Sequence, residues 1–167
     1  MFTQGQMAVY GSHGVCVFLE SETRTVDRKP VQYYVLEPLE QPGARFYVPM
    51  ANPAAISKLS PLLSRQELND LLRSEKERNE DCWIPEENRR KQRYRELIGS
   101  TDRSGLIAMV RCLHLHRRSQ REQGKKFHQC DENFLRDAER LLCGEFALVL
   151  GIEKNQVGEY IRSHLVD

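Results

Sequence analysis

The sequence lacks any apolar run of the roughly 18 residues that a membrane-spanning helix needs. Its longest apolar runs, 106–110 and 146–150, are short and are bounded by charged residues or glycine. The N-terminus also lacks the basic region and apolar stretch of an export signal. With 29% charged residues in 167, we expect a globular protein of the cytoplasm with no membrane segment.

Paired cysteines and nucleotide-binding glycine loops are missing as well. The five cysteines are an odd number and are scattered along the chain, which favours free thiols in a reducing compartment. There is no Gly-x-x-x-x-Gly-Lys loop and no Gly-x-Gly-x-x-Gly fingerprint. We therefore expect no enzyme, no catalytic residues and no cofactor.

A few possible metal ligands occur late in the chain. Cys112 and His116 are four residues apart and share a helix face, and His128 and Cys130 follow a short way on. No Cys-x-x-Cys pair is present to complete a structural zinc site, so we expect no metal. A zinc-dependent or thiol enzyme built on these four residues stays open as an alternative.

The excess of one sign of charge over the other is small for the whole chain but large in two segments. The net charge is only +1. Residues 85–128 nevertheless carry twelve bases against five acids, while 129–167 carry four bases against eight acids. A basic block beside an acidic segment indicates a polyanionic partner better than the mean charge does.

The first third of the chain is typical of β-structure. Four apolar and aromatic runs of strand length occur at 7–10, 15–19, 31–36 and 46–48, separated by turn-forming clusters. Short strands with tight turns predict a small, strongly bent barrel of the SH3 or Tudor kind.

Helix signals follow. Asn52-Pro53 and the capping box from Ser64 to Glu67 mark helix starts. Apolar residues then recur at helical spacing, with Asp102 and Asp131 as further caps. The sequence predicts an α+β protein with a β domain over 1–52 and an all-α domain over 53–167.

Two features of the helical half point to nucleic acid. Arg111, His114, Arg118 and Arg121 fall on one stripe of a predicted helix, which either tracks phosphates or is a solvated face. Trp83, the only tryptophan, precedes a proline-started helix. It is either a staple on the helical core or a wedge for a base step in a minor groove.

Segments of the first half, taken in order, resemble a known domain. They are Gly5-Gln6-Met7-Ala8-Val9-Tyr10, His13-Gly14-Val15, Thr23-Arg24-Thr25, Tyr33-Tyr34-Val35-Leu36 and Tyr47-Val48-Pro49. This order is similar to the RNA-polymerase-interacting domain of bacterial CarD/CdnL-type transcription regulators, which the transcription-repair coupling factor shares. Trp83 and the segments 97–102, 110–113 and 142–148 resemble the family's helical C-terminal domain.

The resemblance implies partners and sites. It implies that the β domain pairs with a strand of the RNA polymerase β subunit, through Arg24, Thr25, Tyr47, Val48 and Pro49. It also implies that the helical domain contacts promoter DNA at the upstream edge of the melted region, through Trp83, Arg89, Arg90, Arg93, Arg118 and Lys125. The family is not catalytic.

The function that the resemblance implies is stabilisation of the open promoter complex. The alternative is a stand-alone nucleic-acid-binding module with a protein-binding β domain. We expect a monomer when the protein is unbound, because each long apolar stripe has a plausible partner within the helical half.

Overall fold

The computed structural model describes residues 2–78 and 82–165, and these residues form two compact units. One unit contains the chain up to Leu62 together with Gly99–Thr101, and the other contains Leu63–Ile98 and the chain from Asp102 onward. In the described part of the chain, no helix has the length and apolar character needed to cross a membrane.

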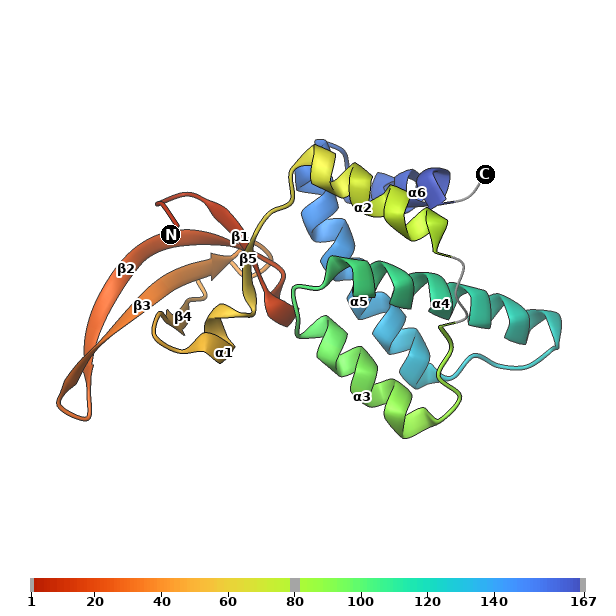
Figure 1. The fold of residues 1–167 in the computed structure, drawn as a ribbon, viewed down its shortest axis with the longest axis horizontal. Coiled ribbons are helices and arrows are strands. Elements are labelled where there is room, and N and C mark those ends of the chain that lie inside the picture. The colour runs from red at the N-terminus through yellow and green to blue at the C-terminus, as the bar shows by residue number, and fades with distance from the viewer. Residues whose placement is uncertain (1, 79–81, 166–167) are drawn as a thin grey trace. The chain divides into compact units, whose positions relative to one another are not determined.

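The first unit is an antiparallel sheet of five strands in the order β4-β3-β2-β1-β5 (Figure 1). The strands are β1 (Met7–Tyr10), β2 (Val15–Val26), β3 (Lys29–Pro38), β4 (Phe46–Pro49) and β5 (Leu59–Pro61). A 3₁₀ turn, Gly11–His13, links β1 to β2, and the short helix α1 (Pro53–Ile56) follows β4.

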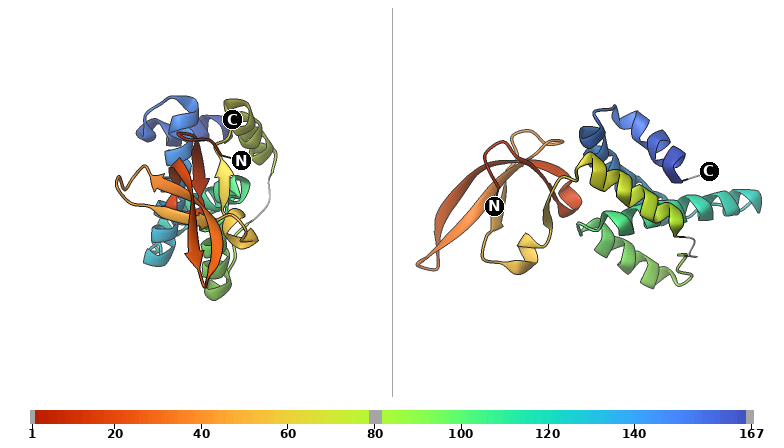
Figure 2. Two further views of the ribbon diagram at one scale, coloured as in Figure 1. Left: turned by 90° about the vertical axis from the view of Figure 1, so that its left-hand side faces the viewer. Right: turned by 45° about the horizontal axis from the view of Figure 1, so that its top comes forward.

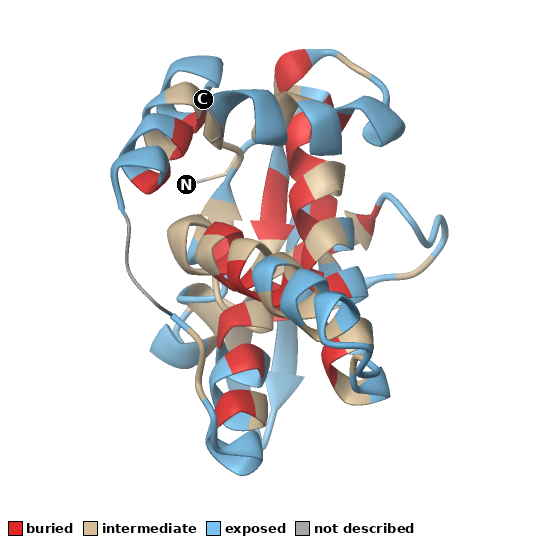
Figure 3. Ribbon diagram, turned by 90° about the vertical axis from the view of Figure 1, so that its right-hand side faces the viewer, coloured by how far each residue is buried: buried red, intermediate tan, exposed pale blue. Residues whose placement is uncertain are grey.

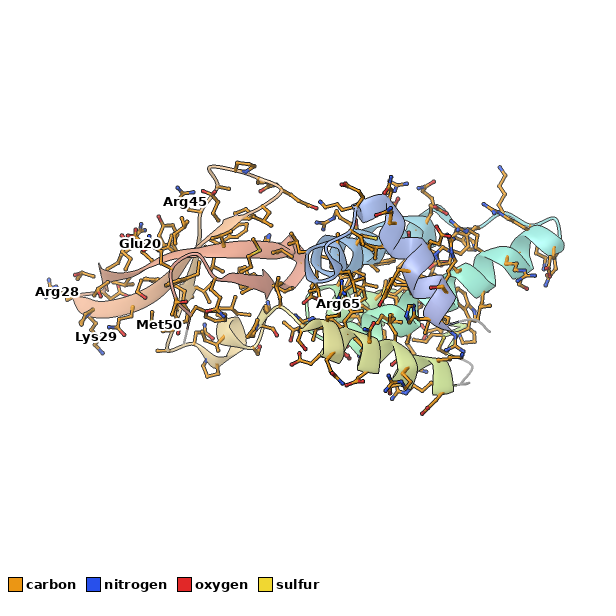
Figure 4. The ribbon with its side chains drawn as sticks, turned by 90° about the horizontal axis from the view of Figure 1, so that it is seen from above. Glu20, Arg28, Lys29, Arg45, Met50 and Arg65 are labelled. Carbon is orange, nitrogen blue, oxygen red and sulfur yellow. The ribbon has the colours of Figure 1, made fainter. Side chains whose placement is uncertain are left out.

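Strands β2 and β3 form a long curved hairpin, seen from two other sides in Figure 2. Its two-residue turn places Asp27 and Arg28 at φ values of 49° and 65°, as a hairpin turn that matches the strand twist requires. Figure 4 labels Arg28 and Lys29 at the far end of this hairpin, where the side chains are exposed. A register shift between Phe18 and Glu20 marks a bulge, which bends the hairpin.

One face of the sheet carries the core of this unit. Its members are fully or almost fully buried: Ala8, Cys16, Phe18, Leu36, Val48 and Leu59. Alternate residues of the same strands point to the other face, because side chains alternate along a strand. That second face displays polar and aromatic groups, including Arg24 and Tyr47.

The second unit is helical. Its helices are α2 (Arg65–Glu77), α3 (Glu87–Ile98), α4 (Arg103–Glu122), α5 (Gln129–Leu150) and α6 (Lys154–Leu165). In Figure 3 the buried residues run along the helix faces that meet other helices. The largest fully buried side chains of this unit include Phe146, Leu113, Ile107, Leu135, Leu68, Leu72 and Val157.

Several predicted helix signals are confirmed. Ser64 and Glu67 form the capping box of α2, Asn52 caps α1 ahead of Pro53, and Asp102 caps α4. Asp131 is not a cap: α5 begins after His128, and the Asp131 side chain is buried in the first turn. A buried carboxylate needs a partner, and Asp131 finds one on another helix.

The boundary between the units lies after Leu62, later than the expected 52. The expectation ended the β domain at the first helix signal, but α1 is only one turn long and the chain then returns to the sheet as β5. The strand β5 has three residues and ends in Pro61, so its sequence carries no alternating pattern to reveal it.

Candidate functional site

Trp83 lies between two other side chains of the helical unit. The imidazole of His116 on α4 stacks on the indole, with ring centroids 3.5 Å apart and planes within 10° of parallel. The guanidinium carbon of Arg90 on α3 lies over the same indole, 4.4 Å from its centroid. Trp83 is half-buried and packs against the helical core, as a staple would, while part of the ring stays accessible.

Arg90 is held by a buried ion pair. Its Nε and Nη2 donate to the two carboxylate oxygens of Asp131 at 3.0 and 3.2 Å. The Arg90 Nη1 donates to the carbonyls of Ile84 and Pro85, at 3.0 and 3.4 Å. The Arg90 side chain is 6% exposed and that of Asp131 is 1% exposed. The guanidinium therefore ties the segment around Trp83 to both α3 and α5.

This placement corrects one expectation. Arg90 was expected to contact DNA, but its donors point to a carboxylate and to carbonyls inside the protein. A guanidinium that is 6% exposed and paired with a buried carboxylate is not accessible to a phosphate, and Arg90 contacts Trp83 instead.

The surroundings of His116 favour its neutral form. Burial lowers the pKa of the His116 imidazole below its ordinary value, and the charges of Arg90 and His128 lower it further, while Asp131 opposes them. The ring of Phe127 also contacts His116, with centroids 6.2 Å apart and planes tilted by 51°. The positive charge beside the indole is thus that of Arg90, balanced by Asp131.

Exposed bases occur close in sequence to Arg90 and Phe127. Arg89 and Arg93 are one helical turn apart on α3, next to the buried Arg90, and Lys125 lies two residues before Phe127. All three are exposed and have no ion-pair partner within residues 2–78 and 82–165. Of the sequence-predicted residues, Arg89 and Arg93 are thus exposed on the helix that carries Arg90, and Lys125 is exposed two residues before Phe127.

The predicted stripe on α4 is divided by its contacts. Arg111 donates to the carbonyls of Glu75 and Arg78, and His114 lies 2.9 Å from the Glu139 carboxylate. Arg118 is exposed and faces Glu122 at 3.4 Å. Because Arg118 is two residues from His116, it lies about 200° around the helix and points away from Trp83.

The β unit brings a second group of predicted residues together. The guanidinium of Arg24 on β2 lies 4.0 Å from the ring centroid of Tyr47 on β4, across the intervening strand β3. Glu22 accepts a hydrogen bond from Arg24 Nε at 3.0 Å and, with Tyr47, raises the pKa of that guanidinium. The ring of Tyr33 meets Tyr47 edge-on at 6.3 Å. This exposed face thus combines aromatic rings with one positive charge.

The strand β4 is an edge of the sheet. Met50 N–H donates to the Gln32 carbonyl, so alternate residues, Val48 and Phe46, direct their peptide groups toward β3. The peptide groups of Tyr47 and Pro49 then point outward. Proline has no N–H, and the Pro49 carbonyl accepts from Asn52 within the chain. Tyr47 alone on β4 therefore offers both an outward donor and an outward acceptor.

The remaining two residues of the predicted polymerase site differ in what they can offer. Thr25 is exposed on the hairpin beside Arg24. The Val48 side chain is fully buried in the core, so it can shape the edge but cannot contact a partner.

Two residues of the alternative metal site, Cys112 and His116, are packed within the helical unit. Cys112 is buried in the helical unit, and His116 stacks on Trp83. Within the residues that the structure describes, no group of three or more His, Cys, Asp or Glu side chains is placed to hold a metal ion.

Sequence reasoning missed the supporting roles of His116 and Asp131. The spacing of His116 to Cys112 suggested metal ligation, and the position of Asp131 suggested a helix cap. Their partners are distant in sequence: Trp83 precedes α3 and lies 33 residues before His116, and Arg90 lies on α3, 41 residues before Asp131.

Comparison with known protein families covers both units. A model described as the CarD-like/TRCF RID domain matches residues 2–60, and a model described as the CarD C-terminal domain matches residues 67–162. A comparison with curated proteins found no match. The two family matches follow the two units closely and together span most of the chain. The chain therefore belongs to the CarD-like family of transcription regulators that interact with RNA polymerase.

Proposed function

We propose that this protein stabilises the open promoter complex by binding two parts of the transcription machinery together. In this proposal the β unit binds the RNA polymerase β subunit, and the helical unit binds DNA at the upstream edge of the melted promoter. The observation that carries it is that the helical unit holds the half-buried indole of Trp83 and also exposes Arg89, Arg93 and Lys125, for which no ion-pair partner lies among the described residues. The protein acts without catalysis of its own.

The polymerase contact is proposed at the β4 edge. A partner strand pairs with the outward donor and acceptor of Tyr47, which is recognition by strand addition. Arg24 and the Tyr47 ring lie beside this edge and supply a charge and an aromatic surface for side chains of the partner. Thr25 contributes from the neighbouring part of β2.

The DNA contact is proposed around Trp83. Arg89, Arg93 and Lys125 bind phosphates, which fixes the position of the protein on the duplex without reading its sequence. Trp83 inserts at a base step of the minor groove, where apolar side chains unstack and bend DNA. Arg118 lies on another side of α4 and adds only long-range attraction.

The two contacts work together through simple thermodynamics. A ligand shifts an equilibrium only by its differential affinity for the two states, so a wedge that fits distorted DNA favours the open complex. Docking on polymerase raises the effective concentration of the helical unit near the promoter. The DNA contact can therefore be weak for free duplex, which agrees with a net charge of only +1.

The DNA half is tested by the lifetime of open complexes formed by polymerase on promoter DNA. We expect Trp83→Ala to shorten the lifetime without changing polymerase binding, and Trp83→Phe to keep part of the effect. An unchanged lifetime with Trp83→Ala would contradict the wedge. Tight, salt-dependent binding to duplex DNA without polymerase would instead support a stand-alone nucleic-acid module.

The polymerase half is tested by copurification of the β subunit. We expect Arg24→Glu to weaken copurification, because it reverses the charge beside Tyr47. Arg28→Glu is the matched control, since Arg28 lies on the same hairpin at its far end (Figure 4). Equal copurification of the Arg24→Glu variant and the unaltered protein would remove this docking surface.

A further inference from the structure

The surroundings of Trp83 restrict how the indole can meet DNA. His116 stacks on the indole with centroids 3.5 Å apart, which leaves no room for a guanidinium on the same face. The Arg90 guanidinium, 4.4 Å from the ring centroid, therefore covers the opposite face. Both π-faces are occupied within the protein, and the accessible part of the half-buried ring is its edge.

Both covering groups are themselves fixed. Arg90 is anchored by Asp131 and by the carbonyls of Ile84 and Pro85. His116 projects from the middle of the 20-residue helix α4, and Phe127 lies against it. Arg90 cannot leave the indole without breaking a buried ion pair, and His116 is held by its contacts with the rings of Trp83 and Phe127.

We infer that His116 and Arg90 are positioning residues that clamp Trp83, so that it contacts DNA by its edge and does not stack on a base. This inference rests on the proposed function for its DNA part. The clamp holds the indole rigid before DNA binds. A side chain that is fixed beforehand loses little rotamer freedom on binding, so the entropic cost of the contact is low. A tryptophan that stacks on a flipped base needs at least one free face, which this arrangement does not offer.

The clamp can be tested without DNA, because Trp83 is the only tryptophan and its fluorescence reports this site alone. A protonated imidazole in stacking contact quenches indole emission. We expect emission of the full-length protein to fall on acidification as His116 becomes protonated, at a lower pH than for an ordinary histidine because burial lowers the pKa of this imidazole. The charged groups that face His116 are Asp131, Arg90 and His128, and they shift the midpoint without removing it.

The matched variants separate the clamp from general effects of pH. His116→Phe keeps an aromatic ring on the indole but cannot be protonated, so the quenching should be lost. His128→Asn is the control and should keep it. In His116→Ala the indole should also become more accessible to acrylamide, and His116→Phe should restore the protection. The same pH profile in His116→Phe as in the unaltered protein would overturn the clamp.

The edge contact is tested on open complexes. His116→Ala should shorten the open-complex lifetime by about two- to tenfold, the loss expected for one aromatic pair, and His116→Phe should restore it. With 2-aminopurine at the upstream fork, edge insertion should leave its emission unchanged or raised. A fall in that emission that depends on Trp83 would show base stacking and overturn the edge contact.

The two sets of outcomes can be told apart. If Trp83→Ala leaves the open-complex lifetime unchanged, the proposed function fails while the fluorescence results still decide the clamp. If the lifetime depends on Trp83 but not on His116, the proposed function stands and the positioning role of His116 is refuted.

Discussion

Removal of the Asp131 carboxylate leaves a positive charge inside the helical unit with no counter-charge. The Arg90 side chain is 6% exposed and donates two hydrogen bonds to the Asp131 carboxylate, at 3.0 and 3.2 Å. Breaking a buried pair on one side costs about 3–5 kcal/mol. A domain has a total free energy of unfolding of about 5–15 kcal/mol, so we expect Asp131→Ala to leave this unit barely folded.

The measurement is urea unfolding followed by circular dichroism, since the Trp83 signal itself changes with the pair. The double variant Arg90→Met with Asp131→Leu should recover most of the loss, because removing both charges together is close to neutral. Asp70→Ala is the surface control: its pair with Arg73 is 50–69% exposed and is worth under about 1 kcal/mol. If Asp131→Ala costs no more than Asp70→Ala, or if the double variant is no better than Asp131→Ala, the ion pair does not hold this unit together.

Three smaller perturbations follow from other contacts. Ser64→Ala should lower the free energy of unfolding by about 1 kcal/mol in denaturant titrations, because the Ser64 hydroxyl caps Glu67 N–H of α2; no change would show that α2 starts without it. Tyr94→Phe should cost no more than about 0.5 kcal/mol, because the Tyr94 hydroxyl is buried without a hydrogen-bond partner among the described residues; a larger loss would reveal a partner. Hydrogen bonding to His114 lowers the pKa of Glu139, so this carboxylate stabilises the fold at neutral pH and loses that effect as pH falls through its pKa. The difference in melting temperature between Glu139→Gln and the unaltered protein should therefore shrink on acidification. A constant difference would contradict the assignment.

The general plan of the fold was predictable from local patterns. The β-then-α order follows from a change of apolar period near residue 50, and the caps at Asn52, Ser64 and Asp102 follow from short-range chemistry. The strand β5 and the later boundary were missed, because a three-residue strand is selected by its pairing with β1 and not by its own sequence.

The candidate site was predictable only in its exposed members. Arg89 and Arg93 carry charge in a pattern that a sequence displays directly. The clamp on Trp83 joins side chains of α3, α4 and α5, and the closeness of Arg90 to Asp131 depends on how these helices pack. Arg90 was predicted to be a surface base, because helical spacing shows which residues share a face of α3 but not which face is buried.

The proline at the end of β4 also limits pairing between copies of this protein. Sheet borders with several outward amides are templates on which copies of the same protein grow into aggregates. Pro49 has no N–H, and its carbonyl accepts a hydrogen bond from Asn52 N–H. Only Tyr47 on this edge strand can therefore pair with another strand through both its donor and its acceptor. Such a short edge can pair with a short strand of a partner but resists aggregation by repeated edge pairing, which keeps the protein available to RNA polymerase.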